Sequence, residues 1–228
     1  MPFGKIFKTV TKIITAPIKI VTKALSWLSP KIDLPDFGTS DFDDFEKGIL
    51  LNKQSNDASI PVIYGTRLVG GTRVFMETSG TDNTYLYMAI VLGEGEINGI
   101  TEIRVDDKVV TFASSLADNT AVEVASSDSN FYKNSASLIR LEPHFGSDGQ
   151  SASSLLGTLS SWGSNHKLSG LAYLAIRFTW NQDAFTGIPK VQAKVQGKKI
   201  VTLNSSLVES SPTFSANPAF CLLDYLRN

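Results

Sequence analysis

The sequence predicts a mainly β fold with an α/β insertion in its middle. From residue 48 onward, short segments rich in β-branched and aromatic residues alternate with Gly, Asn and Asp turn signals. The connections between them are short, which favours antiparallel neighbours. Between these strands lies a polar, serine-rich stretch that carries one helical spacing of apolar residues. The two patterns together indicate a β body interrupted by a mixed segment.

Five strands are expected before the insertion, each bounded by a turn signal. They are Ile60–Tyr64, Thr72–Glu77, Thr84–Leu92, Ile100–Val105 and Val109–Phe112. The turns are supplied by Gly70-Gly71, by Gly80 with Asp82-Asn83, by Gly93 with Gly95, and by Asp106-Asp107.

The insertion is expected at residues 111–169. Residues 113–136 contain many serines and few apolar anchors, which indicates a surface excursion. Ser137–Leu141 is predicted to return as a strand. Ser153–Trp162 has the spacing of a short helix, with Leu155, Leu156, Leu159 and Trp162 on one side.

Two long strands follow the insertion. Leu171–Trp180 is almost wholly apolar, which predicts a central strand buried on both faces. Val191–Leu203 alternates apolar and polar residues, so one of its faces should meet solvent or a polar partner. At Asn217-Pro218 an N-cap residue precedes proline, which predicts a helix start. Residues 206–228 are expected to form a linker and the start of a helix that leads into a missing C-terminal part.

Residues 1–28 are predicted to form an amphipathic helix with a kink near Pro17. Apolar residues recur in alternating steps of four and three, and the lysines fall mainly on the other side. Packing against a partner, packing on its own domain, and binding to a membrane surface all remain open as uses of this face. The proposed partner-binding residues here are Phe3, Phe7, Val10, Ile14, Val21 and Leu28.

Residues 29–47 are predicted to be an extended acidic linker, because they contain two prolines, a glycine and six acids. The spacing of the acids lacks the glycine and the terminal glutamate of an EF-hand, so a calcium loop is not predicted. Three aromatic residues are expected to anchor the linker on a neighbouring surface: Phe37, Phe42 and Phe45.

Composition and motifs argue against several functions. A formal net charge of −1 gives no basic face for nucleic-acid recognition. Cys221 is the one cysteine, so an intramolecular disulfide and a cysteine zinc site are excluded, and a small buried side chain is the favoured interpretation. Neither His144 nor His166 has a nearby ligand partner, and no nucleophile motif occurs. No catalytic residue, metal site or cofactor is predicted, and the protein is not expected to be an enzyme.

Several motifs occur in order: IPVIYG, GGTRVF, YLYM followed by a glycine-rich turn, GIPK, and the NPA helix start. In this order they resemble the N-terminal region of bacteriophage central tail-tip proteins, the host-specificity or J-like family of tail hubs. The resemblance covers most of residues 48–228. It implies a barrel-like hub domain made of residues 48–110 and 170–205, with residues 111–169 inserted.

The resemblance also implies a structural function at the tail tip of a virion. Such a hub would be a homotrimer that closes the distal end of the tail tube and carries receptor-binding parts for host attachment and genome delivery. Its expected partners are copies of itself, a distal tail or tube protein, the C-terminus of the tape-measure protein and other tail-tip proteins. Assembly would take place in the host cytoplasm.

Two alternatives come from other functional classes. In the first, the basic N-terminal helix belongs to a membrane-active tail protein and inserts into the host membrane. In the second, the β body binds or hydrolyses carbohydrate. The hub hypothesis makes a specific prediction about assembly, in which a closed ring of three covers strand edges near Ile60–Tyr64 or Val191–Leu203. Val195 is expected on that interface.

Overall fold

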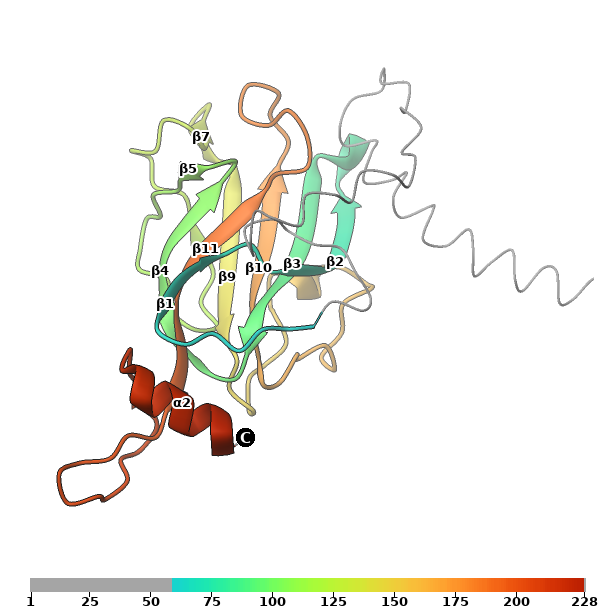
Figure 1. The fold of residues 1–228 in the computed structure, drawn as a ribbon. Coiled ribbons are helices and arrows are strands. Elements are labelled where there is room, and N and C mark those ends of the chain that lie inside the picture. Colours follow the sequence, from blue (N-terminus) through green and yellow to red (C-terminus); the bar gives the residue numbers. More distant parts are fainter. Residues whose placement is uncertain (1–58, 228) are drawn as a thin grey trace, which may run out of the picture.

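The structure, a computed structural model, describes residues 59–227. The predicted helix at 1–28 and the predicted linker at 29–47 lie outside these residues, and so do all nine proposed partner-binding side chains from Phe3 to Phe45. The described residues form two antiparallel sheets that face each other, with a short helix at one end (Figure 1).

The first sheet has five strands in the order β2-β3-β10-β9-β6. Each neighbouring pair is antiparallel. The strands are β2 (Thr72–Ser79), β3 (Tyr85–Glu94), β10 (Leu171–Thr179), β9 (Ile139–Phe145) and β6 (Val122–Glu123). The apolar β10 lies at the centre of this sheet, as its composition predicts.

The second sheet has the order β1-β11-β4-β5, with β12 paired to β11 as well. Its strands are β1 (Thr66–Val69), β11 (Val191–Ile200), β4 (Ile97–Val105), β5 (Lys108–Val109) and β12 (Thr213–Phe214). A small separate hairpin pairs β7 (Tyr132–Lys133) with β8 (Ala136–Ser137). The helical elements are the 3-10 turns η2 (Thr81–Asn83) and η3 (Leu156–Thr158) and the helix α2 (Pro218–Arg227). The prediction of a mainly β fold is confirmed.

Two turns show why Asp and Gly residues are found between the strands. The β4–β5 hairpin turns at Asp106 and Asp107, whose φ angles of 49° and 63° match the left-handed turn that suits the twist of a hairpin. Gly71, between β1 and β2, has a φ of 69°, and a Cβ there would lie 2.5 Å from the carbonyl oxygen of Val91. Only glycine fits this position without displacing the backbone of β3.

The main core lies between the two sheets and takes apolar side chains from both of them. Because side chains alternate along a strand, β3 and β10 also carry apolar residues on the outer face of the first sheet. A second cluster buries that outer face, where Leu155, Leu156, Leu159 and Trp162 pack over Tyr87, Ala89, Val91, Tyr173 and Ala175. Residues 150–168, which we call the cover segment, therefore form a third layer over the sheet.

The structure corrects two predictions about strand edges. Ile60–Tyr64 is not a strand, since it holds only a single bridge from Val62 to Glu94, and the first strand begins at Thr66. β11 is not an edge either, because β1 and β4 pair with its two sides. Val195 is fully buried in the core between the sheets, so it does not lie on an interface.

The predicted insertion is closely built into the body. Its strand β9 pairs with β10 inside the first sheet, so a boundary at residues 111 and 169 does not separate one sheet from another. Residues 111–169 contain no α-helix. The helix predicted at Ser153–Trp162 is limited to the 3-10 turn η3, and the apolar side chains of the segment pack over the outer face of the first sheet.

Candidate functional site

The helix α2 begins where the sequence predicts it. Asn217 Oδ1 accepts a hydrogen bond of 3.0 Å from the backbone N–H of Ala219, and Pro218 occupies the first helical position. This cap satisfies a backbone donor that the first turn leaves without a partner. The local sequence therefore fixes the start of α2 at the end of the β body.

One face of α2 is held to the body by a carboxylate. Asp224 Oδ2 accepts hydrogen bonds from Lys198 Nζ at 2.7 Å and from the Tyr64 hydroxyl at 2.6 Å. Burial and the hydrogen bond to Asp224 raise the pKa of Tyr64 above its ordinary value, so Tyr64 stays a donor at neutral pH. The contact fixes the position of α2 relative to β11 and to the segment before β1.

The opposite face of α2 is apolar and exposed. Leu222, Tyr225 and Leu226 have exposed fractions of 57%, 69% and 73%, and no residue of the helix is buried. Cys221 is half-buried, with its Sγ 3.7 Å from the carbonyl oxygen of Ser215, so the prediction of a buried thiol is wrong. The face of α2 that carries Leu222, Tyr225 and Leu226 is therefore unpartnered within residues 59–227.

A protruding hairpin lies beside α2. Leu203 and Glu209 form a bridge, and Asn204 Oδ1 accepts hydrogen bonds from the backbone N–H groups of Ser206 and Val208. Leu207 lies at the tip, 77% exposed, with a φ of 59°. A branched side chain in the left-handed region is uncommon and needs such local bonds to hold it.

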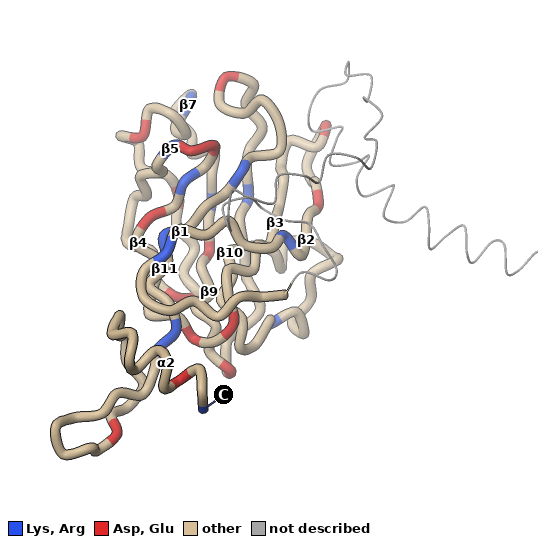
Figure 2. The backbone as a smooth tube through the Cα atoms, viewed as in Figure 1, with Lys and Arg blue, Asp and Glu red and all other residues tan. Residues whose placement is uncertain are grey.

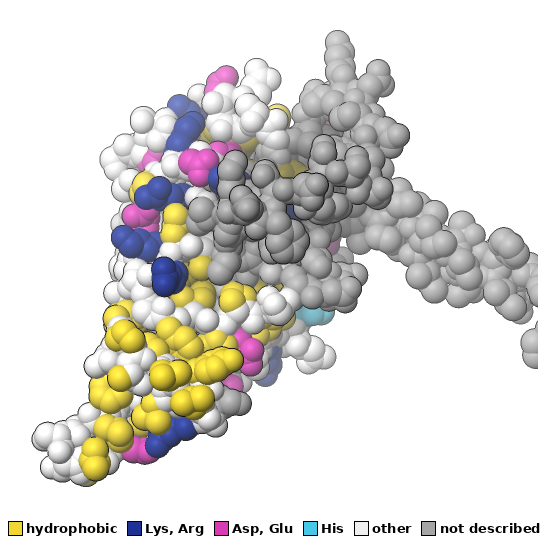
Figure 3. Space-filling view, viewed as in Figure 1, with side chains coloured by type: hydrophobic (Ala, Val, Ile, Leu, Met, Phe, Trp, Pro, Cys, Tyr) yellow, Lys and Arg dark blue, Asp and Glu magenta, His cyan; other side chains and the backbone are white. Residues whose placement is uncertain are grey.

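The hairpin and the helix form one surface. Arg227 of α2 forms an ion pair of 2.6 Å with Glu209 of the hairpin. Figure 3 shows hydrophobic side chains gathered over this end of the molecule. We call it the apolar end, and its exposed large side chains are Leu207, Val208, Leu222, Tyr225 and Leu226.

Bases around the apolar end are paired with acids. Lys198 pairs with Asp224, Lys199 with Glu96 and Arg227 with Glu209. Figure 2 traces these charges along the backbone near α2 and the end of β11. Such pairing leaves these three side chains little net charge to attract an anionic ligand, which favours an apolar protein surface as the partner.

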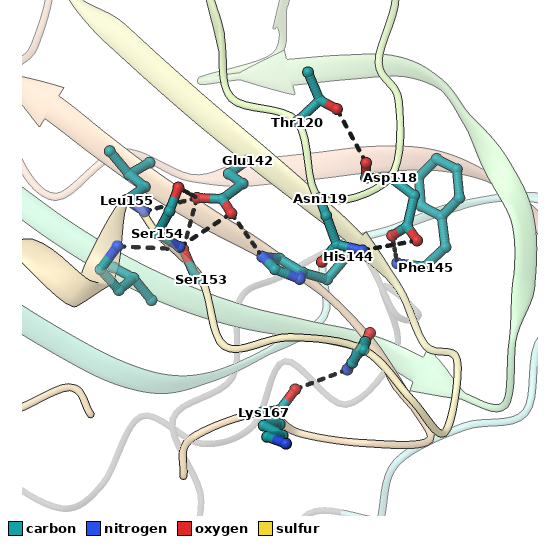
Figure 4. A network of polar contacts seen from close by, with 12 residues as sticks. Asp118, Asn119, Thr120, Glu142, His144, Phe145, Ser153, Ser154, Leu155 and Lys167 are labelled. Carbon is teal, nitrogen blue, oxygen red and sulfur yellow. Dashed lines mark hydrogen bonds and ion pairs between the residues drawn. The ribbon is translucent and has the colours of Figure 1, made fainter. Parts of the chain in front are cut away.

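A second candidate lies beneath the cover segment, where β9 turns Glu142 and His144 away from the main core (Figure 4). Glu142 accepts hydrogen bonds from the hydroxyls of Ser153 and Ser154 and from the backbone N–H groups of Ser154 and Leu155. Burial would raise the pKa of Glu142. The contact with His144 and these hydrogen bonds outweigh it and lower the pKa to about 2.

His144 is fully buried and lies flat against Tyr173, with ring centroids 4.2 Å apart. Its Nε2 lies 3.4 Å from Glu142 Oε1. His144 stands on β9, between β10 and β6 in the first sheet. Burial, followed by the charge of Glu142, raises the pKa of Tyr173.

The two ends of the cover segment are joined by Gln150. Its Oε1 accepts a hydrogen bond of 3.0 Å from the backbone N–H of Gly146, and its Nε2 donates to the carbonyl oxygen of Lys167 at 2.9 Å. On the other side of β9, Asp118 Oδ1 accepts from the Phe145 N–H at 2.7 Å, and the Asn119 N–H donates to the Pro143 carbonyl. These bonds close the edge of the sheet beside the network.

The geometry beneath the cover segment does not match a nucleophilic relay. Ser153 Oγ donates to the Glu142 carboxylate and not to an imidazole nitrogen, as a base-activated serine would. A pocket of about 500 Å³ lies beside it and is lined by residues that include Ser153, Trp162 and Lys167. The arrangement serves to hold the cover segment on the sheet.

Residues 59–227 contain no group of three or more His, Cys, Asp and Glu side chains placed to hold a metal ion. In the same residues, no helix has the length and apolar character needed to cross a membrane.

None of the nine predicted partner-binding residues lies in the described part, and sequence reasoning missed both candidates there. The spacing of Leu222, Tyr225 and Leu226 after a predicted helix start was a signal for the apolar end. The pairing of Glu142 with residues 153–155 had no comparable signal, because it depends on how a loop folds back over β9.

Comparisons with known proteins complete this description. The chain is 27% identical over 208 residues to the baseplate hub protein pb3 of Escherichia phage T5, in a match that covers 74% of this chain and 22% of that protein. This chain thus spans about a fifth of the length of the relative. A chain in the solved virion of a native gene transfer agent particle matches 84% of this chain and 38% of its own length, at 13% identity and a TM-score of 0.47. No protein-family model matches. The chain is therefore similar over most of its length to a phage baseplate hub protein, which confirms the predicted resemblance to tail hubs.

Proposed function

We propose that the protein is a structural component of a phage tail or baseplate, acting as a hub and not as an enzyme. The observation that carries this proposal is the similarity to a baseplate hub protein over 74% of the chain. The two-sheet body suits a scaffold, since the cover segment is held by the buried hydrogen bond from the Leu155 N–H to Glu142, and α2 by the partly buried bond between Lys198 and Asp224.

In this proposal three copies form a closed ring at the distal end of the tail tube, at the tail tip. The ring joins a distal tail or tube protein on one side to receptor-binding parts on the other, for host attachment and genome delivery. Particles are assembled in the host cytoplasm. The apolar end supports such a role, because exposed apolar side chains beside paired charges are typical of protein–protein interfaces.

The N-terminal segment is proposed as the tether of the hub. Its predicted apolar stripe would bind a neighbouring tail protein, such as the C-terminus of the tape-measure protein, while the acidic linker spans the distance. Membrane contact by the same stripe is the competing use.

The experiment that tests this function is localisation in the virion. Antibody or gold labelling of the protein in purified particles, viewed by electron microscopy, should place it at the distal end of the tail. Label on the capsid or along the tube, or particles with complete tails formed without the protein, would contradict the proposal.

A further inference from the structure

We propose that the outer stripe of α2 binds the N-terminal segment, residues 3–28, of a neighbouring copy of this chain. The inference rests on the proposed hub function, because it assumes that copies lie side by side. The inference names a surface to which the N-terminal tether binds. The sequence alone does not identify that surface.

The first argument is the spacing of the two apolar stripes. On α2, Ala219, Leu222 and Leu226 follow one another in steps of three and four, and all three are exposed. Residues 3–28 repeat the same steps along their whole length. Steps of three and four place side chains on one seam, where the knobs of one helix fit the holes of another.

The second argument is charge. The bases nearest the stripe already have acidic partners, namely Asp224 for Lys198 and Glu209 for Arg227. The face therefore offers apolar area and little net charge. If the apolar residues of the N-terminal segment take the a and d positions of a heptad, Lys12 and Lys19 take the f position on the opposite side. They would therefore stay in solvent when the stripe is buried. A lipid surface would instead be favoured by bases near the apolar side chains of α2 that have no acidic partner.

The third argument is position. The segment that leads into β1 lies beside α2, because Tyr64 bonds Asp224 and the Lys198 N–H donates to the carbonyl oxygen of Ile63. The described chain thus passes α2 at Tyr64, shortly before β1 begins at Thr66. Residues 29–58, about 30 residues, can span up to ~100 Å when extended, which is enough to reach the same surface on the next copy of a ring. Exchange of one element between identical copies is a known route to closed assemblies.

The test uses cysteine cross-linking between two differently tagged full-length chains. Both chains carry Cys221→Ser, which removes the natural cysteine. One chain also carries Leu222→Cys on α2, and the other carries Ile14→Cys or Val21→Cys on the predicted stripe. Matched controls replace the stripe cysteines by Lys12→Cys or Lys19→Cys on the opposite side of the segment.

After the two chains are mixed and assembled, a short thiol cross-linker should join the two tags. The stripe positions should give a cross-linked yield at least about fivefold above that of the lysine positions. Equal yields from both sides of the segment would overturn the inference. So would cross-links that form only when both cysteines are placed in one chain, because the segment would then dock on its own α2.

The mass of the mixed sample before cross-linking separates this inference from the function on which it rests. A closed ring without stripe cross-links removes the N-terminal segment as the occupant and leaves the hub function standing. Absence of any assembly, together with absence of the protein from tails, contradicts the hub function itself. The melting temperature of the Leu222→Cys chain should match that of the parent, since Leu222 is exposed.

Discussion

The carboxylate of Glu142 in β9 accepts a hydrogen bond of 2.7 Å from the backbone N–H of Leu155 in the cover segment. This single bond joins two parts of the chain that sequence reasoning treats as a strand and a separate helix. It also brings Leu155 and its neighbours onto the outer face of the first sheet, where they bury Tyr87 and Tyr173. A buried acid thus organises a layer that is otherwise held by apolar contacts.

Replacing Glu142 by Gln should lower the free energy of unfolding by about 2–4 kcal/mol, because a neutral amide accepts fewer of the four hydrogen bonds made to this carboxylate. Urea unfolding measures this change. Glu123→Gln is the matched control, since Glu123 is exposed and lies 3.8 Å from Arg140. Equal stability of the two variants would show that Glu142 does not organise the cover segment.

The Glu142 carboxylate should make the free energy of unfolding depend on pH in the acidic range. Its pKa is about 2 in the folded protein, against 4.5 for an ordinary glutamate, so folding favours the charged form. The contribution to stability is present above about pH 4.5 and is lost as the pH falls toward 2. The difference in unfolding free energy between the parent and Glu142→Gln should therefore shrink over this range. A difference that stays constant from pH 6 to pH 3 would contradict this assignment.

Replacing Asp224 by Asn should loosen α2 without unfolding the β body. The charge that holds both Lys198 and Tyr64 is lost, at a cost of about 1–2 kcal/mol to the docking of the helix. Hydrogen exchange should become faster in residues 218–227 and stay unchanged in β3 and β10. Glu96→Gln, which breaks an ion pair on the exposed side, should leave exchange in α2 as it is. Protection of α2 that survives Asp224→Asn would show that other contacts hold it.

Two lysine substitutions should have opposite consequences. Leu222→Lys should keep the fold and reduce assembly, because the side chain is exposed on α2, whereas Val195→Lys should unfold the protein, because Val195 is fully buried between the sheets. Circular dichroism and light scattering measure the two effects. Ser164→Lys, on an exposed loop, is the control for added charge. Normal assembly of a folded Leu222→Lys variant would exclude the apolar end as an interface.

The strands that carry strong local patterns were predictable from the sequence. The apolar run of β10 indicates a central strand, and Asn217-Pro218 indicates the start of α2, because propensity and capping act over a few residues. Which strands pair with one another could not be predicted from these local patterns. β11 alternates apolar and polar residues as an edge strand can, yet β1 covers one side of it through contacts between residues more than 120 positions apart.

The two candidate sites, beneath the cover segment and at the apolar end, are formed by contacts between residues far apart in the sequence, so local patterns did not predict them. Leu155, Leu156, Leu159 and Trp162 have helical spacing, but these side chains cover the outer face of the first sheet. Glu142 accepts hydrogen bonds from the backbone N–H groups of Ser154 and Leu155, which lie in a different part of the chain. Leu207 is exposed because Asn204 closes a hairpin around it, which composition does not reveal. Tertiary contacts override local preference at both places.

The proposed hub forms a closed ring through its apolar end. The mass and rotational symmetry of the assembled full-length chain, measured by native mass spectrometry and by electron microscopy of the particle, test it most directly. Three copies around one axis are expected, with the surface of Leu222 and Leu226 covered. A chain that remains monomeric, or an open array in which α2 faces solvent, would contradict it.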